Sequence, residues 1–212
     1  MYRPIHFKED RLPVLHQAMA AIGLANLVTV GADGVPQASP LPLLLRADEG
    51  PCGTLYGHFA RANPQWRETP AGSPALAIFM GPDAYISPSW YATKAETGKV
   101  VPTWNYATIH ARGPITFFED ADALLNLVGG LTDRHEEGRA APWRVADAPD
   151  DFIQAQLRGI VGFRLMLTSV EGKWKMSQNR PAADRTSTVS GLARDGAASV
   201  AALVRAGGAS VP

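Results

Sequence analysis

Apolar residues fall on one helical face over 12–22 and again over 120–131, where Asp120 is placed to cap the helix. Runs rich in Val, Leu, Thr and aromatic residues, bounded by Gly, Pro and Asn, predict strands in much of the remaining chain. Two further short helices are predicted, one that begins at Pro64 and one over 151–157. The predicted strands cover 25–30, 35–39, 43–45, 54–58, 74–80, 104–112, 115–118 and 160–169.

Gly, Pro and Asn mark where the predicted strands and helices begin and end. An Asp-Gly pair is a strong signal for a tight hairpin, and a Gly-Pro pair indicates a turn that ends the strand before it. An Asn-Pro pair is typical of a helix start, with Asn as the cap. The turns are predicted at Asp33-Gly34, Gly81-Pro82 and Gly113-Pro114, and the helix start at Asn63-Pro64.

Many strands without regular βαβ alternation predict a mainly β protein, an antiparallel barrel with peripheral helices. Neither GxGxxG nor GxxxxGK[ST] occurs, which disfavours a Rossmann or P-loop fold. We expect a barrel domain with inserted helices over 1–170. A C-terminal extension over 171–212, made of a polar loop and a helix over 184–204, is expected to pack on the barrel.

The composition narrows the class of protein. The 212 residues are 46% hydrophobic and 19% charged, as in globular domains with a substantial core. Twenty basic and twenty acidic residues give a formal net charge of zero, so no long-range field favours nucleic acid. The single cysteine, Cys52, excludes an intrachain disulfide and fits a reducing compartment. Without a signal-peptide pattern or an apolar run of about 20 residues, we expect a cytoplasmic protein and no membrane.

Three stretches, 56–66, 81–106 and 172–180, combine aromatic rings with hydroxyl and amide groups. Stacking and hydrogen bonds together hold a flat ligand with a polar edge, and this mixture of side chains provides both. The same rings and prolines would also form tight turns that cap a barrel, so a structural role stays open. The presence of three such stretches in one small barrel favours a shared ligand site.

His58, Arg61 and Asn63 lie at the predicted junction between a strand and a helix. Backbone N–H groups and the positive end of the helix dipole favour anions at such a junction, so these residues form a candidate phosphate site. The alternative is that Arg61 forms a surface salt bridge while Asn63 only caps the helix.

Ser177, Gln178 and Asn179 place a hydroxyl and two amides in succession. Because amides both donate and accept hydrogen bonds, they suit the N3–H and carbonyl edge of a flavin or a pyrimidine-like ring. An ordinary polar loop would have the same composition, so that alternative stays open. The neighbouring cations are Lys173, Lys175 and Arg180.

Signatures of other chemistries are weak. The sequence has no Gly-x-Ser-x-Gly motif, and Cys52 has no histidine near it in the chain, which disfavours nucleophilic hydrolysis. His58, His110 and His135 with Glu136 match no zinc-binding spacing, so we expect no metal.

Several motifs together resemble a known family. The segments MYRPIHF, GHFARANPQW, GPDAYISPSWY, VPTWNY, IVGF and KWKMSQNR, in this order, are similar to the PaiB-type family of FMN-binding split-barrel proteins. The resemblance extends from Met1 to about Leu203. It implies a split β-barrel like that of pyridoxamine phosphate oxidases, usually a homodimer with flavin sites at the subunit interface. One departure is Ser39, which stands where the family motif AxHLPL has histidine.

The resemblance also implies FMN as the cofactor and assigns the candidate residues to its parts. The phosphate needs cations or N–H donors, for which the first choice is the group at 58–63 and the second is Arg180 or Lys175. The ring needs an apolar slot with donors along one edge. The residues expected to bind FMN are His58, Arg61, Asn63, Thr103, Trp104, Asn105, Ser177, Gln178, Asn179 and Arg180, of which Ser177, Gln178 and Asn179 belong to the same or the partner subunit.

Two functions remain open. Members of the family are described as negative transcriptional regulators, which implies a flavin-dependent or flavin-sensing regulator. The related folds imply instead an FMN oxidoreductase that accepts hydride from a nicotinamide cofactor or a small reductant. The zero net charge and the lack of a helix-turn-helix pattern argue against direct DNA binding.

Overall fold

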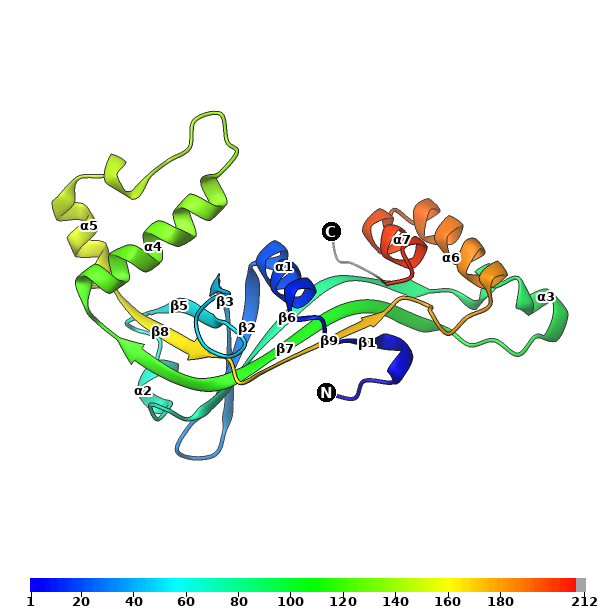
Figure 1. Ribbon diagram of the computed structural model, residues 1–212, viewed down its shortest axis with the longest axis horizontal. Coiled ribbons are helices and arrows are strands. Elements are labelled where there is room, and N and C mark those ends of the chain that lie inside the picture. Colours follow the sequence, from blue (N-terminus) through cyan, green and yellow to red (C-terminus); the bar gives the residue numbers. More distant parts are fainter. Residues whose placement is uncertain (209–212) are drawn as a thin grey trace. The chain divides into compact units, whose positions relative to one another are not determined.

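The computed structural model describes residues 1–208, which form two compact units (Figure 1). Unit 1 comprises Met1–Ile22, Phe79–His110 and the described part of Val170–Pro212, and unit 2 comprises Gly23–Ile78 and Ala111–Ser169. The chain changes unit inside the strands β6 (Pro74–Ile86) and β7 (Thr103–Phe118). It changes unit again between Ser169 and Val170. Residues 209–212 of the expected extension lie outside the described residues.

In unit 2 the strands follow the order β3-β2-β6-β7-β8-β5-β4. The pairs β2–β3, β2–β6, β4–β5, β5–β8 and β7–β8 are antiparallel. Small and aromatic residues fill its core: Leu27, Leu55, Phe59 and Phe163 are fully buried. Gly57 on β5 is required by this packing, because a Cβ there would lie 2.6 Å from the Phe163 ring. The other strands of this unit are β2 (Leu24–Val30), β3 (Pro36–Pro42), β4 (Leu44–Arg46), β5 (Thr54–Ala60) and β8 (Ile160–Met166).

Helix α4 (Ala121–Glu136) covers part of this unit through an apolar face. Leu127 and Leu131 of α4 are buried against Leu44 of β4, with Tyr56 and Phe118 packed beside them. Burial of such side chains stabilises the fold by about 1.5–3 kcal/mol each. The remaining helices of unit 2 are α2 (Gln65–Glu68), the 3₁₀ helix η3 (Val145–Asp147) and α5 (Asp150–Leu157).

In unit 1 the strands β6, β7, β9 (Ser169–Lys175) and β1 (Lys8–Glu9) are successive neighbours. Trp174 of β9 and Leu15 of α1 (Leu12–Ile22) are buried, and Gly172 gives them room because a Cβ there would lie 2.4 Å from Leu15. Helices α6 (Ala182–Arg194) and α7 (Ala198–Arg205) lie side by side (Figure 1). The short helices are η1 (Ile5–Phe7), η2 (Pro88–Trp90) and α3 (Thr93–Thr97).

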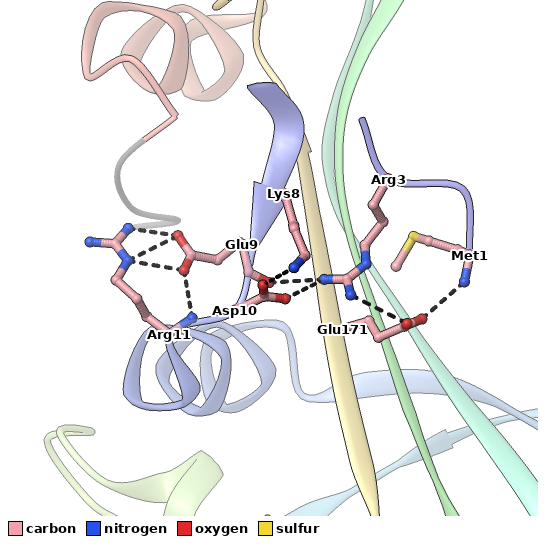
Figure 2. Close-up of polar contacts among 7 residues, drawn as sticks. All are labelled: Met1, Arg3, Lys8, Glu9, Asp10, Arg11 and Glu171. Carbon is pink, nitrogen blue, oxygen red and sulfur yellow. Dashed lines mark hydrogen bonds and ion pairs between the residues drawn. The ribbon is translucent and has the colours of Figure 1, made fainter. Parts of the chain in front are cut away.

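A network of ion pairs connects the N-terminal segment of unit 1 to strand β9 (Figure 2). The Arg3 guanidinium lies 2.5 Å from an Asp10 oxygen and 3.3 Å from a Glu171 oxygen, and the Lys8 ammonium also pairs with Asp10 at 2.5 Å. Hydrogen bonds from Lys8 and Arg3 hold the pKa of Asp10 below its ordinary value. The remaining pairs are Met1 N with Glu171 at 2.9 Å and Arg11 with Glu9 at 2.6 Å.

Most of the predicted elements are confirmed. The helix at 12–22 has the predicted bounds, and Asp120 caps α4 by accepting a hydrogen bond of 2.9 Å from the Ala123 N–H. The strands predicted from alternation are present, several of them longer than expected. None of the helices within residues 1–208 has the length and apolar character needed to cross a membrane.

Four local predictions are wrong, two of them turns and two in the C-terminal extension. Gly81-Pro82 and Gly113-Pro114 lie inside strands β6 and β7 and do not end them. At Gly113 the reason is close packing, since a Cβ there would lie 1.8 Å from the Met166 carbonyl oxygen. The helix expected over 184–204 is two helices, broken at Gly196 with φ 79°. Strand β9 occupies part of the expected polar loop.

Candidate functional site

The residues expected to bind FMN fall into two groups, one in each unit. Unit 2 contains His58, Arg61 and Asn63 around the end of β5, and unit 1 contains the residues of β7 and of the segment after β9. The unit 1 group is Thr103, Trp104, Asn105, Ser177, Gln178, Asn179 and Arg180.

The Arg61 side chain is largely engaged by its own chain. Its Nε donates to the Arg158 carbonyl at 2.7 Å, and Nη2 donates to the Ile160 carbonyl at 3.2 Å. Nη1 pairs with the Glu119 carboxylate. Three of the five guanidinium N–H groups thus have partners, which ties the end of β5 to the start of β8. The role of Arg61 as a phosphate ligand stays a prediction.

Asn63 and Ser39 belong to one polar network beside α2. The Asn63 side chain accepts a hydrogen bond of 3.0 Å from Gln65 N–H and donates one of 3.2 Å to Ser39 Oγ. Ser39 in turn donates to the Gln65 side chain at 2.6 Å. The helix begins one residue later than expected and is a single turn long, so the cap position falls on Pro64 and not on Asn63, whose side chain accepts from the first helical residue. Ser39 is hydrogen-bonded within this network. Position by position, the motif AxHLPL over 38–43 places Ser39 at the variable position and Pro40, not Ser39, at the histidine position.

His58 points away from the barrel core, toward a hollow of about 340 Å³ that α4 lines with Leu131 and His135. Its Nδ1 is buried and has no hydrogen-bond partner among residues 1–208. Burial lowers the pKa of the imidazole, so the ring is predominantly neutral at pH 7. A neutral imidazole offers an anion a hydrogen bond but no charge.

In unit 1 the predicted ring-edge residues form a buried polar pair. The Asn105 amide donates to Ser177 Oγ at 3.0 Å, and the two residues are only 1% and 4% exposed. Ser177 has φ 61°, a left-handed conformation that is sterically costly for residues with a Cβ. Such strained backbone is concentrated at binding sites. The structure thus brings together two residues that are 72 positions apart, both of which the sequence singled out.

Three cations of β9 and the turn after it lie in the same unit without a carboxylate partner in the described chain. Lys175 donates to Thr103 Oγ1, Lys173 lies 5.2 Å from the centre of the Tyr106 ring, and Arg180 lies 4.5 Å above Tyr91. Within residues 1–208 none of the three forms an ion pair with an acidic side chain. We call Lys173, Lys175 and Arg180 the cationic cluster.

Electrostatics within the cationic cluster favour an anion. Burial lowers the pKa of Lys175, and the nearby charges of Lys173 and Arg180 lower it further, while Tyr106 opposes them. Burial raises the pKa of the Tyr91 hydroxyl, while the charge of Arg180 beside it opposes that shift. A phosphate or an anionic ring would relieve the repulsion among these cations.

The other predicted residues of unit 1 differ in their surroundings. Gln178 folds back on its own turn, accepting from Met176 N–H at 2.7 Å and donating to the Trp174 carbonyl at 2.6 Å. Asn179 is exposed. Trp104 is 53% exposed, and its ring meets Tyr85 edge-on at 6.1 Å between centres. An exposed aromatic pair of this kind offers a flat apolar surface.

Tyr91 and Tyr106 belong to the stretch 81–106 that the sequence singled out, but neither was among the residues expected to bind FMN. Nothing local shows which cation packs on each ring. The alternation of Lys173 and Lys175 in the sequence was the available signal, since alternate residues of a strand share one face. Within residues 1–208 no three potential metal ligands among His, Cys, Asp and Glu converge.

Comparison with known proteins identifies the family. Residues 1–169 match the family described as "Putative FMN-binding domain". This chain belongs to that FMN-binding family. The resemblance noted in the sequence is thereby confirmed, and so is FMN as the cofactor of the family.

Individual relatives agree with this assignment. Protease synthase and sporulation protein PAI 2 of Bacillus subtilis is 32% identical over 192 residues, which cover 91% of this chain and 89% of the relative. An uncharacterized protein of Aspergillus fumigatus is 32% identical over 238 residues, covering 92% and 91%. The FAD and heme binding protein of Mycobacterium smegmatis has a similar structure, with a TM-score of 0.59 at 20% identity over 79% of this chain and 73% of its own. The predicted split-barrel fold is confirmed.

The residues of unit 1 fit an FMN molecule. A phosphate requires cations that are not already neutralised, and the cationic cluster supplies them. The ring edge requires hydroxyl and amide groups, which Thr103, Asn105 and Ser177 provide. The family match ends at 169, before the residues of the cationic cluster.

Proposed function

We propose that this protein is a flavin-dependent regulatory protein that binds FMN at the cationic cluster of unit 1. The observation that carries the proposal is that Lys173, Lys175 and Arg180, whose charges act on one another, form no ion pair with an acidic side chain in the described chain. They lie in the unit that contains the buried Asn105–Ser177 pair. Because the geometry leaves these cations unpaired and engages Arg61, we now prefer Lys175 and Arg180 as phosphate ligands over the group at 58–63.

Each residue has a proposed role. Lys175 and Arg180 bind the phosphate, and Lys173 adds positive charge beside them. Thr103 and Asn105 orient the ring edge by hydrogen bonds, while Trp104 provides an apolar surface for stacking. Ser177 fixes the Asn105 amide. Bound FMN supplies reversible one- and two-electron redox chemistry. The regulator would therefore respond to whether FMN is bound or to whether it is oxidised or reduced.

An FMN titration tests the proposal. The purified protein should quench the fluorescence of added FMN in a saturable manner and retain a flavin absorbance spectrum after gel filtration. In parallel, Arg61→Ala separates the two candidate phosphate sites, and we expect it to weaken FMN binding less than Lys175→Met does. A protein that neither retains colour nor quenches FMN contradicts the proposal.

The regulatory partner is proposed to be another protein rather than DNA, because the formal net charge is zero. A gel-shift assay with the promoter of its own operon, titrated with salt against competitor DNA, tests this choice. Sequence-specific binding that resists competitor would contradict it. A cytoplasmic location remains part of the proposal.

We further propose that the protein acts as a homodimer. Between residues 80 and 104 of unit 1, four large apolar side chains are about half exposed or more, which is unusual for a surface that stays in water. A second copy would cover them and contribute to the flavin site. Sedimentation or light scattering of the FMN-bound protein should give twice the mass of one chain, and a monomer would contradict the proposal. The side chains are Met80, Tyr85, Val101 and Trp104.

The second candidate function is an FMN oxidoreductase. The cationic cluster favours it, because positive charge near the flavin stabilises the reduced anion and raises the redox potential. FMN-dependent oxidation of NADH or NADPH by the purified protein, followed at the nicotinamide absorbance, distinguishes it from a sensor. Turnover no faster than free FMN would remove this candidate.

A further inference from the structure

A groove of about 520 Å³ lies in unit 2, within the size range of small-molecule sites. Strands β4, β5, β7 and β8 and helix α4 line it, and His58, Arg61 and Asn63 do not. It is thus distinct from both groups of expected flavin residues.

Strand register explains why these side chains converge. Leu44 of β4 pairs with Tyr56 of β5, which pairs with Arg164 of β8, which pairs with Thr116 of β7. Directly paired residues point to the same face of a sheet, so the four form one row across four strands. Arg46 lies two residues beyond Leu44 and therefore shares this face.

The groove has an apolar wall. Leu44 and Leu127 are buried, and the rings of Tyr56 and Phe118 pack against them. The Phe118 ring is held over Gly162, where a Cβ would lie 2.4 Å from it. A flat or branched apolar group therefore finds a preformed surface here, while the opposite side of the groove is polar.

Two arginines supply the polar side. Arg164 Nε donates to Thr116 Oγ1 at 3.0 Å, which fixes the direction of its guanidinium and leaves four N–H groups for a ligand. Arg46 reaches toward α4, where its Nη2 would lie 3.5 Å from a Cβ at Gly130. Neither arginine has a carboxylate within ion-pair distance in residues 1–208.

One acidic group also lines the groove and sets its charge. Glu49 accepts a hydrogen bond of 2.7 Å from the Tyr56 hydroxyl. The charges of Arg46 and Arg164 also act on this hydroxyl. Two cations and one carboxylate leave a single excess positive charge, which matches a monoanion better than a dianion.

We propose that this groove binds a small organic monoanion, an aromatic carboxylate. Its carboxylate binds Arg46 and Arg164, and its ring packs on Leu44, Tyr56 and Phe118. Asn126 of α4 lies at the groove and makes no side-chain hydrogen bond within the described residues, so it can select a polar ring substituent. The site is independent of the FMN site.

Calorimetric titration with benzoate and benzamide tests the site, because the two probes share shape and differ in charge. We expect benzoate to bind with a dissociation constant on the order of 1 mM and benzamide at least about 10-fold more weakly. Arg46→Gln with Arg164→Gln should abolish benzoate binding. Arg158→Gln, which removes an exposed arginine of the same unit outside the groove, should leave it unchanged.

Several results would overturn the proposal. The first is that benzoate does not bind at a concentration ten times the expected dissociation constant. The second is that benzamide binds as tightly as benzoate, and the third is that the double variant still binds benzoate. FMN titrations of the same variants separate this site from the flavin site. FMN affinity should stay within about 2-fold of wild type, and a loss of FMN binding together with benzoate would show that the groove is the flavin site instead.

Discussion

Strand β9 carries two charged groups of opposite character on one face. At its start, Glu171 joins the N-terminal network of Figure 2, in which every cation has a carboxylate within 3.3 Å. Two and four residues later, Lys173 and Lys175 belong to a cluster that has no acidic partner in the described chain. The two groups even meet in register, because Lys8 of the network pairs with Lys173.

The pKa shifts have opposite meanings in the two groups. In the N-terminal network, hydrogen bonds from Lys8 and Arg3 lower the pKa of Asp10, so the ionised form stabilises the fold. In the cationic cluster, burial and like charges lower the pKa of Lys175, so the charged form opposes the fold. The paired charges of the N-terminal network therefore stabilise the fold, while the unpaired cations of the cationic cluster are available to bind a ligand. This contrast supports the cluster as the FMN site.

The largest effect is expected from removing two charges of the cluster. Lys175→Met combined with Arg180→Gln should weaken FMN binding by about 100-fold, since each charge-assisted contact contributes about 1.5 kcal/mol. FMN fluorescence quenching measures the change. Lys8→Gln is the matched control, because it removes a cation from the neighbouring strand but from the paired network, and it should keep the wild-type affinity. Equal FMN affinities in the wild type, the double variant and Lys8→Gln would contradict the distinction between the cationic cluster and the paired network.

The N-terminal network should respond in stability. Arg3→Gln leaves the carboxylates of Asp10 and Glu171 without their shared partner, and the Arg3 side chain is only 13% exposed. We expect a loss of about 2 kcal/mol in the free energy of unfolding, measured by urea denaturation, with FMN affinity unchanged. An unchanged free energy of unfolding would show that the N-terminal network does not stabilise the fold.

The smallest effect has the opposite sign. Lys175→Met should raise the Tm of the FMN-free protein by about 2 °C, because it removes a partly buried cation from repulsive neighbours. The effect depends on pH in a defined direction. Between the lowered pKa of folded Lys175 and the ordinary value of about 10.4, the unfolded chain binds more protons, so wild-type stability rises with pH.

The Lys175→Met protein should lack that part of the rise, which thermal denaturation at several pH values would show. A variant that is less stable than wild type near pH 7 would mean that the Lys175–Thr103 contact outweighs the repulsion.

Local patterns predicted local structure well. The helix at 12–22 and the Asp120 cap depend on neighbours within four residues, and both are confirmed. The Gly113-Pro114 turn was wrong because the close approach of Met166, more than 50 residues away, determines the backbone there. Strand β9 was predicted to be a loop, because its lysines give the sequence a polar composition. Its pairing with β7 and β1, which makes it a strand, is visible only in the structure.

The candidate site shows the same division. Composition singled out Asn105 and Ser177, but only the fold shows that they bond to each other. Arg61 was a reasonable phosphate ligand from its sequence, yet its partners at 119, 158 and 160 come from segments that no local pattern connects to it. The absence of an acidic partner for the cluster is likewise a property of the folded chain.

Lysine footprinting tests the central claim without any substitution. The protein is labelled with an amine-acylating reagent, with and without saturating FMN, and the modification of each lysine is measured by mass spectrometry. FMN should protect Lys173 and Lys175 while leaving Lys8 and the exposed Lys99 unchanged. Equal labelling of Lys175 in the two samples, while the absorbance shows bound flavin, would contradict the account.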